Sequence, residues 1–191
     1  MEFDEISKNL KKVLSEKRYL HSLGVEEVAC DLALIHGFDM ERAKIAGILH
    51  DCAKYLSNEQ LLDECQNYGL PVTDIEVKCP FLLHAKVGAI YARIKYGIQD
   101  DQIISAITYH TTGRPAMSLL EKIIFTADYI EPYRRPLPRI EVIRKMAYND
   151  IDIAVAMVAE NVLDYLRASN QDIDTMTIDT YHYYRDKISI Q

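Results

Sequence analysis

Apolar residues recur every three to four positions along most of the chain, which predicts amphipathic helices, and no stretch alternates convincingly as a β-strand would. The first two helices are expected over residues 3–16 and 17–36, with Gly37 ending the second. A third is expected after Asp39, a residue that can cap a helix N-terminus, and it includes the apolar run Ile45-Ala-Gly-Ile-Leu49.

Local start and stop signals define the helices in the middle of the chain. Ser57-Asn-Glu-Gln60 has the pattern of a capping box, and Gly69-Leu-Pro71 ends the helix that it starts. Pro80 can begin the next helix, which runs through Ile94 and is closed by Gly97. Further helices are expected from Asp100 or Asp101 to about His110, and over 117–129, 139–148 and 151–169.

Two segments depart from this pattern. Residues Glu131–Pro138 contain three prolines and are expected to form a loop. Residues 175–188 are rich in tyrosine and fit either a helix or an extended segment. Since no linker, repeat or change of composition divides the chain, residues 1–191 are expected to form a single all-α domain.

Composition and charge narrow the class of protein. Of the 191 residues, 49% are hydrophobic and 27% charged, a balance typical of a water-soluble globular protein with its own core. A net charge of −7 disfavours binding to nucleic acids, so an anionic substrate would need a local cluster of cations. The sequence shows no membrane-spanning apolar segment and no secretory signal, so we expect a cytoplasmic protein that binds no membrane and keeps its four cysteines reduced.

Histidines and aspartates carry the candidate chemistry. Neutral imidazoles and carboxylates brought together from separate helices are ligands that divalent metals take in proteins. A single histidine is more often a core or surface residue, and a single aspartate is more often a cap, so the inference depends on the whole set. The candidate metal ligands, in order on successive expected helices, are His21, His50, Asp51, His84, His110 and Asp128.

The order of these residues and the short sequences around them resemble a known enzyme family. The set resembles the HD-domain metal phosphohydrolase superfamily. The local sequences resemble the bacterial YqeK family of symmetrical diadenosine tetraphosphate hydrolases over about residues 17–185. They are Arg18-Tyr-Leu-His21, Gly47-Ile-Leu-His50-Asp51-Cys-Ala-Lys54, Leu83-His84-Ala-Lys-Val-Gly88, His110-Thr-Thr-Gly113-Arg114-Pro115 and Ala127-Asp128-Tyr-Ile-Glu131-Pro132. The last two are the most specific to the family, whereas the His-Asp pair is common across the superfamily.

The resemblance implies a helical bundle with a two-metal site, often iron, between its helices. Asp51 would bridge the two ions. A metal-activated hydroxide would then cleave diadenosine tetraphosphate symmetrically into two ADP. The implied ligands are His21, His50 and Asp128 for one ion and His84 and His110 for the other.

Basic and hydroxyl residues beside these ligands are expected to bind the substrate. Lys54 lies one turn after Asp51, Arg18 lies one turn before His21, and an arginine fork such as that of Arg134 suits phosphate oxygens. The resemblance also implies that residues 170–176 close over the nucleotide and that the chain forms a homodimer. The expected substrate contacts are Arg18, Lys54, His84, His110, Thr111, Arg134, Gln171 and Thr175, and the expected catalytic residues are Asp51, Lys54, His84 and His110.

Several other residues are weaker candidates. Tyr129, Tyr181 and Tyr184 could stack on an adenine, although most tyrosines are expected at the edge of the core. Lys86, Arg114 and Arg135 are reserve phosphate contacts, each expected as a surface charge. His36 and His182 are expected to be structural or exposed.

Alternative functions share the same residues. An HD phosphohydrolase acting on a mononucleotide, a deoxynucleoside triphosphate or a cyclic nucleotide would have the same ligands. A nucleotide-binding module without turnover and a redox di-iron enzyme would have the same fold, although an intact ligand set disfavours the module. A purely structural all-α domain would need the whole set to arise by coincidence.

Overall fold

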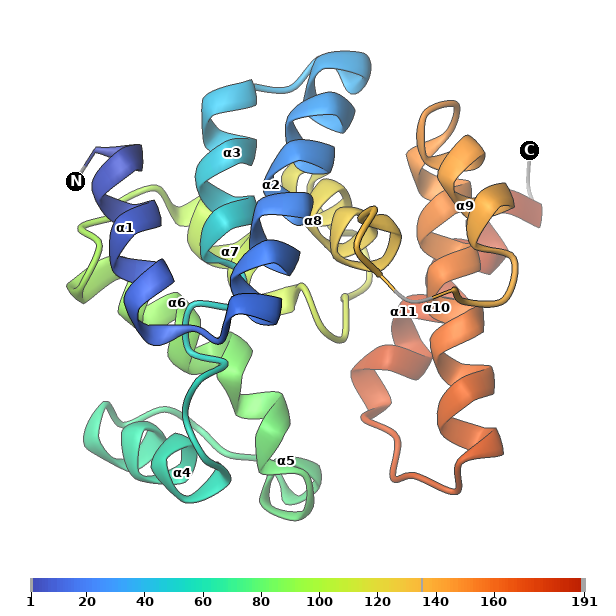
Figure 1. Cartoon of the computed structure of the whole chain (residues 1–191). Coiled ribbons are helices and arrows are strands. Elements are labelled where there is room, and N and C mark those ends of the chain that lie inside the picture. Colours follow the sequence, from blue (N-terminus) through green and yellow to red (C-terminus); the bar gives the residue numbers. More distant parts are fainter. Residues whose placement is uncertain (1, 135, 190–191) are drawn as a thin grey trace.

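The computed structural model describes residues 2–134 and 136–189, and within them every regular element is helical (Figure 1). The all-α fold class predicted from the sequence is therefore confirmed. The α-helices are α1 (Phe3–Val13), α2 (Glu16–His36), α3 (Met40–Leu49), α4 (Asn58–Asn67), α5 (Asp74–Lys78), α6 (His84–Ile94), α7 (Asp101–Tyr109), α8 (Leu119–Ile130), α9 (Ile140–Ala147), α10 (Ile151–Ala168) and α11 (Thr175–Ser189). A short 3₁₀ helix, η1 (Pro80–Leu83), precedes α6.

Capping residues explain several of these boundaries. Ser15 accepts a hydrogen bond from the Arg18 N–H and starts α2, so α1 ends at Val13 and does not continue to residue 16 as predicted. Gly37 adopts a φ of 71° and ends α2, as predicted. The predicted capping box of Ser57 and Gln60 is present at the start of α4.

The segment before α6 differs from the prediction in two ways. Helix α5 was not expected, yet it starts at a capping box of Thr73 and Glu76, a pattern that the sequence contains. The helix expected from Pro80 begins as the η1 turn and becomes α-helical only at His84. This change of helix type places His84 at the N-terminus of α6.

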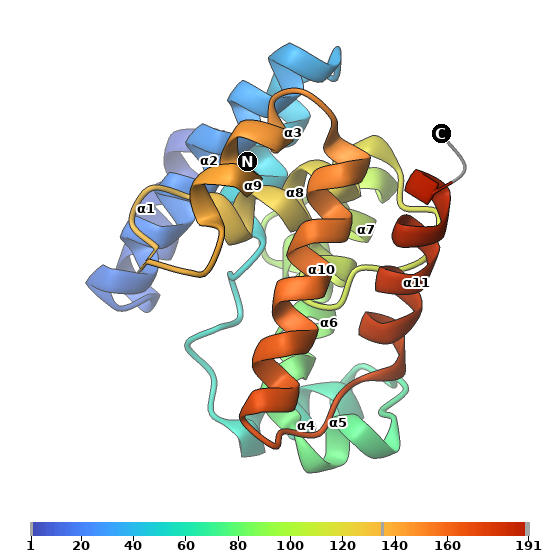
Figure 2. The same ribbon diagram turned by 90° about the vertical axis from the view of Figure 1, so that its right-hand side faces the viewer.

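The tyrosine-rich C-terminal segment is a helix, α11, that packs along α10 (Figure 2). The buried hydroxyl of Tyr184 accepts a hydrogen bond from the Met117 N–H. The Thr180 hydroxyl donates to the Thr112 carbonyl. Because both bonds reach the segment between α7 and α8, helix α11 supports the turn that follows His110.

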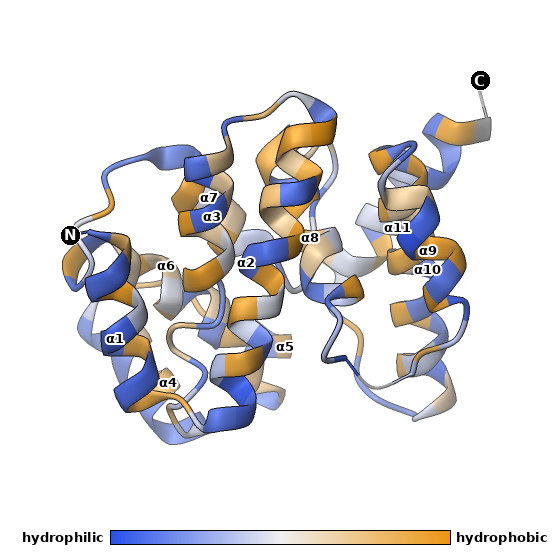
Figure 3. Ribbon diagram, turned by 45° about the horizontal axis from the view of Figure 1, so that its top comes forward, coloured by the Kyte–Doolittle hydropathy of each residue, from blue (hydrophilic) through white to orange (hydrophobic). Residues whose placement is uncertain are grey.

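Buried apolar side chains from every α-helix except α5 form one hydrophobic cluster among the described residues. Apolar and polar residues alternate along the helix ribbons, as expected for amphipathic helices that share a core (Figure 3). Helix α8 packs against α2, α7 and α10, and its buried residues include Ile123, Ile124 and Ala127. These contacts fix the last turn of α8, which carries Asp128.

Candidate metal centre

Side chains predicted as metal ligands converge between α2, α3, α6, α7 and α8. Among the described residues they form overlapping groups, in each of which the ligand atoms lie within 4.8 Å of one another. The four imidazoles and the Asp51 carboxylate are buried. The groups are His21, His50 and Asp51; His50, His110 and Asp128; and Asp51, His84 and His110.

Helix ends hold several of these side chains in place. His50 and His110 are the C-terminal caps of α3 and α7, and His84 begins α6. Asp51 follows His50 in a turn closed by a hydrogen bond from the Lys54 N–H to the Asp51 carbonyl. The residues before His50 are buried in the core, so the backbone is fixed immediately before the candidate ligands.

The Asp51 carboxylate lies between two pairs of histidines. Oδ1 is 3.2 Å from His84 Nε2 and 3.6 Å from His110 Nε2. Oδ2 is 3.5 Å from His50 Nε2 and 3.7 Å from His21 Nε2. One carboxylate oxygen therefore faces each pair, an arrangement suited to a carboxylate shared by two cations.

Each of the four histidines uses Nδ1 to bond to the protein. In His50, His84 and His110, Nδ1–H donates to the carbonyl three residues earlier, at 2.7, 2.5 and 2.7 Å. In His21, Nδ1–H donates to Glu131 Oε1 at 3.0 Å. A neutral imidazole carries a single N–H, so in the neutral form of each ring the Nε2 atom has a free electron pair.

These electron pairs face one another at short range. The Nε2 atoms of His21 and His50 are 3.2 Å apart, and those of His84 and His110 are 3.1 Å apart. Two such electron pairs repel unless a positive charge lies beside them, and a metal ion that accepts both removes the repulsion. The nitrogen and carboxylate donors therefore fit a divalent metal.

Protonation keeps most of these donors in the form that binds metal. Burial lowers the pKa of His50 and lowers the pKa of His84 to about 4, so both rings are neutral at pH 7. Burial would raise the pKa of Asp51 and Asp128. The histidines around Asp51 and the Arg134 charge beside Asp128 outweigh burial and hold both pKa values well below the usual range.

His21 has the opposite preference. Burial lowers its pKa, but the hydrogen bonds to Asp128 and Glu131 and the charges of Asp128 and Asp51 outweigh burial and raise the pKa to about 9. Its surroundings therefore favour a positive charge at the ring, and a proton or a metal ion at Nε2 can supply that charge.

Three cations predicted to bind phosphate lie against this cluster. Arg18 and Arg134 each donate to a carboxylate of the cluster, at 2.6 and 2.8 Å. Lys54 Nζ lies 3.1 and 3.2 Å from the two ring nitrogens of His84, and burial lowers the pKa of this lysine. The structure thus brings together basic residues from α2, the turn after α3 and the loop after α8.

The turn after His110 brings a hydroxyl to the same place. Thr111 Oγ1 is 3.1 Å from His110 Nε2 and 3.4 Å from His84 Nε2. Gly113 ends this turn with a φ of 65°, and a Cβ atom there would lie 2.7 Å from Thr180 Cγ2. The backbone after His110 is therefore closely packed against α11.

The reserve phosphate contacts have other partners. Arg114 was expected as a surface charge, but its Nε and Nη2 atoms donate to the fully buried carboxylate of Glu121, each at 2.8 Å. Lys86 donates to Glu76 at 2.7 Å. Arg135 lies outside the described residues.

Two predicted substrate contacts lie in the C-terminal part of the chain and take no part in the hydrogen bonds of the candidate metal centre. Gln171 is in the connection between α10 and α11, where its N–H donates to the Leu166 carbonyl, and Thr175 is the first residue of α11. Both side chains are exposed, and neither forms a hydrogen bond to a candidate ligand. Their contact with the substrate stays a prediction.

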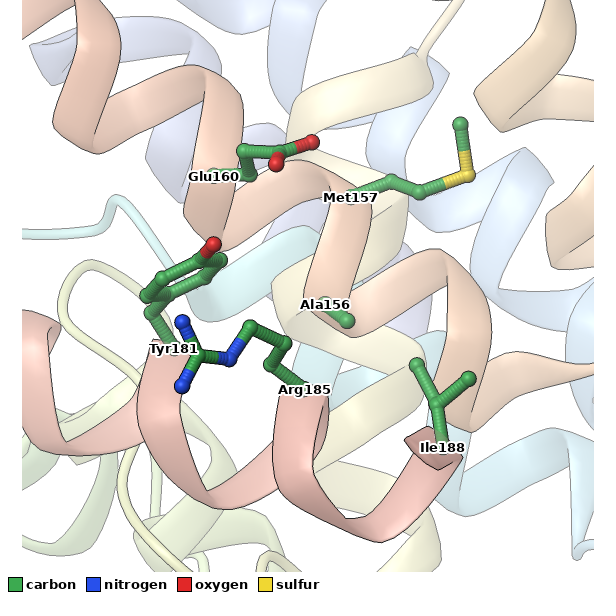
Figure 4. Close-up of a pocket in the computed structure, with 6 residues that line it drawn as sticks. All are labelled: Ala156, Met157, Glu160, Tyr181, Arg185 and Ile188. Atoms are coloured by element: carbon green, nitrogen blue, oxygen red, sulfur yellow. The ribbon is translucent and has the colours of Figure 1, made fainter. Parts of the chain in front are cut away.

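The three tyrosines considered for base stacking differ in environment. Tyr184 is buried in the core, so the prediction that it could stack on an adenine is wrong. The Tyr129 hydroxyl accepts a hydrogen bond from Asn161. Tyr181 lines a pocket of about 190 Å³ between α10 and α11, with the Arg185 guanidinium beside its ring (Figure 4). None of the six candidate ligands lines this pocket.

The remaining histidines and the cysteines lie outside the cluster. His36 Nε2–H donates to the Ala147 carbonyl at 2.7 Å, and His182 is exposed, in line with the structural and surface roles expected for them. The four cysteines are unpaired thiols. Among the described residues, no helix combines the length and the apolar character that a membrane span requires.

One residue of the site was missed from the sequence. Glu131 is buried, and its carboxylate accepts from both the His21 ring and the Tyr133 N–H. The available signal was its position three residues after Asp128, which places both side chains on one flank of a helix end.

Comparison with known proteins agrees with this geometry. The HD-domain family matches residues 18–133, a range that contains all six candidate ligands. The chain belongs to the HD-domain family. Within the family, it is 43% identical to the symmetrical bis(5'-nucleosyl)-tetraphosphatase of Halalkalibacterium halodurans over 91% of both chains. It is 39% identical to the enzyme of the same name from Bacillus subtilis, over 91% of this chain and 92% of the other.

A solved structure of the HD family has the same fold. It is a predicted HD superfamily hydrolase involved in NAD metabolism from Clostridium acetobutylicum, 41% identical in sequence. The two structures superpose with a TM-score of 0.94 over 98% of each chain. The match extends beyond the HD-domain segment and includes the C-terminal helices.

Proposed function

We propose that this protein is a metal-dependent symmetrical hydrolase that cleaves diadenosine tetraphosphate into two ADP. The observation that carries the proposal is the Asp51 carboxylate, with one oxygen toward each pair of facing histidine Nε2 atoms. The names of the two curated relatives, which match over most of the chain, support the substrate class.

We propose two metal ions, with iron as the expected metal. When bound, such ions supply Lewis acidity that activates water and offsets charge on phosphoryl oxygens. The hydrogen-bonded Nδ1 atoms hold the four rings so that Nε2 faces inward, and Asp51 would be the ligand shared by both ions. The proposed ligands are His21, His50 and Asp128 for one ion and His84 and His110 for the other.

The polyphosphate is proposed to bind across the cationic side chains beside the cluster. Arg18 and Arg134 are about one third exposed, so their guanidinium groups can contact a ligand while staying near the carboxylates. Lys54 lies at the ring of His84, where it can hold a phosphoryl oxygen, and Thr111 offers a hydroxyl there. These local charges explain how a chain of net charge −7 can bind a strongly anionic substrate.

The C-terminal contacts and the assembly are further parts of the proposal. Gln171 lies in the connection between α10 and α11, and Thr175 directly follows it; we propose that this connection closes over the nucleotide. We also propose a homodimer, as the sequence resemblance implies, and a cytoplasmic location, as the sequence itself leads us to expect. Light scattering coupled to size-exclusion chromatography measures the oligomeric state.

Product analysis tests the proposed activity. The protein, purified with its metal retained, is incubated with diadenosine tetraphosphate and, in parallel samples, with a mononucleotide or a cyclic nucleotide. The nucleotides are resolved by ion-exchange chromatography beside a chelated sample. ADP as the sole product, absent from the chelated sample, is the expected result. AMP with ATP would contradict symmetrical cleavage. An intact dinucleotide together with a hydrolysed mononucleotide or cyclic nucleotide would identify a different HD phosphohydrolase.

A further inference from the structure

His21 is held differently from the other histidines of the cluster. Three rings donate Nδ1–H to a backbone carbonyl three residues earlier in the chain, so the anchor of each ring is supplied by its own helix end. His21 lies inside α2 and donates to a carboxylate 110 residues away, at the end of α8. Its orientation therefore depends on Glu131.

The two oxygens of Glu131 accept hydrogen bonds from different donors. Oε1 accepts from the His21 ring at 3.0 Å, and Oε2 accepts from the Tyr133 N–H at 2.6 Å. Both partners are donors, so two acceptor oxygens are required. A glutamine at this position has a single acceptor oxygen and an NH₂ group, and one of the donors would then face another donor. The site is built for a carboxylate.

Gly24 provides the space for this carboxylate. It lies one turn after His21 in α2, and a Cβ atom there would be 2.7 Å from Glu131 Oε2 and 2.9 Å from Tyr133 Cδ2. A contact below 3 Å forces one of the groups to move. Any side chain at residue 24 would therefore push Glu131 and the Tyr133 segment away from α2.

We infer that Glu131 is a positioning residue that fixes the His21 ring with Nε2 toward Asp51 and Asp128, and that Gly24 is glycine to admit it. A buried carboxylate bonded to Nδ1–H also increases the electron density at Nε2, which strengthens that atom as a metal donor. The inference rests on the proposed metal site, and it predicts that Glu131 acts on the ion held by His21 and not on the ion held by His84 and His110.

Metal titration of the apoprotein tests this role. Mn²⁺ binding is measured by calorimetry for wild type, E131Q and G24A, with H21A identifying the binding step that involves His21. E131Q and G24A are expected to lower the Mn²⁺ affinity of that binding step by about 10–100-fold and to leave the affinity of the other step unchanged. E131Q in the H21A background is expected to have no further effect, because the ring through which Glu131 acts is then absent.

Gly88→Ala is the matched control, since it adds a Cβ atom to a helical glycine whose nearest neighbours would be at an ordinary 3.5 Å. Wild-type affinity for both ions in folded E131Q or in folded G24A overturns the inference. Equal weakening of both steps, or loss of cooperative unfolding in both metal-free variants, assigns Glu131 to fold stability and also overturns it. Absence of metal binding by the wild type would instead overturn the proposed function.

Discussion

Arg18 donates a 2.6 Å hydrogen bond to Asp51 Oδ2, the oxygen that also faces His21 and His50. The two residues are 33 positions apart, on α2 and in the turn after α3. The bond shows that the central carboxylate of the proposed metal site is also in contact with a proposed phosphate ligand. The proposed metal site and the proposed phosphate site therefore adjoin at Asp51.

Asp51→Ala is expected to lose metal and activity together. It removes the oxygens that face both histidine pairs, so neither proposed ion keeps its shared ligand. We expect metal content to fall and kcat to drop by about 10³-fold, comparable to losing a main electrostatic contact of a transition state. Metal analysis and a rate assay measure both. Asp63→Ala, at an exposed position of α4, is the control, and full activity in Asp51→Ala would contradict the mechanism.

Lys54→Ala is expected to keep the metal and to lose catalytic efficiency. Lys54 Nζ contacts the His84 ring, but a protonated amine is not a metal ligand, so its removal deletes a charge-assisted contact to phosphate. Such a contact is worth about 1.5–3 kcal/mol, so kcat/KM should fall about 10–100-fold. Lys86→Ala, whose amine is bound to Glu76, should behave as wild type. Metal content is measured in parallel. Loss of metal in Lys54→Ala would refute the assignment of Lys54 as a phosphate contact that leaves the metal in place.

Glu121→Gln is expected to lower the free energy of unfolding and to change how that free energy depends on pH. Burial would raise the pKa of Glu121, but hydrogen bonds from Arg114, Ser105 and the Ser118 N–H outweigh it and leave the pKa below its usual value. The ion pair therefore stabilises the fold at pH values above about 4.5 and loses this effect as the pH falls below it.

Urea unfolding at a series of pH values tests this prediction. Because Arg114 is partly exposed, we expect Glu121→Gln to cost about 2–3 kcal/mol at pH 7, less than the roughly 3–5 kcal/mol for breaking a fully buried pair. The difference from wild type should shrink between pH 5 and pH 3. A difference that stays constant over this range would show that the charge of Glu121 is not involved.

Gly113→Ala is expected to destabilise the protein more than Gly37→Ala. Both glycines have positive φ, so each substitution carries the left-handed backbone cost of about 1 kcal/mol. A Cβ atom at residue 113 also collides with Thr180, whereas nothing lies within 4 Å at residue 37. The extra loss should be about 1 kcal/mol or more, measured by denaturant unfolding. Equal losses of unfolding free energy in the two variants would show that the packing of Thr180 in α11 against this turn does not add to the cost.

Most of the fold could be predicted from the sequence because its signals are local. Helical periodicity, Gly37 and the capping box at Ser57 each act within about four residues, and the structure confirms them. The short helix α5 was missed although Thr73 and Glu76 formed the same kind of signal. The tyrosine-rich tail could not be assigned from its pattern because packing against α10 decides its conformation.

The candidate site was predicted in composition but not in arrangement. The six candidate ligands were identified from their order and neighbouring sequences, and the structure brings them together. The sequence did not show that Arg114 pairs with a buried glutamate or that Tyr184 is enclosed in the core. That Gln171 and Thr175 contact the substrate stays a prediction.

The sequence by itself determined the helices, their caps and the identity of the ligand-type side chains, because backbone propensity and capping act between near neighbours. Only the tertiary structure decided that Asp51 presents one oxygen to each histidine pair and that Glu131 reaches His21 across 110 residues. Such contacts depend on how α2, α3 and α8 pack. The physical reason is that a hydrogen bond is fixed to within a few tenths of an ångström by the summed packing of whole helices, which no short stretch of sequence specifies.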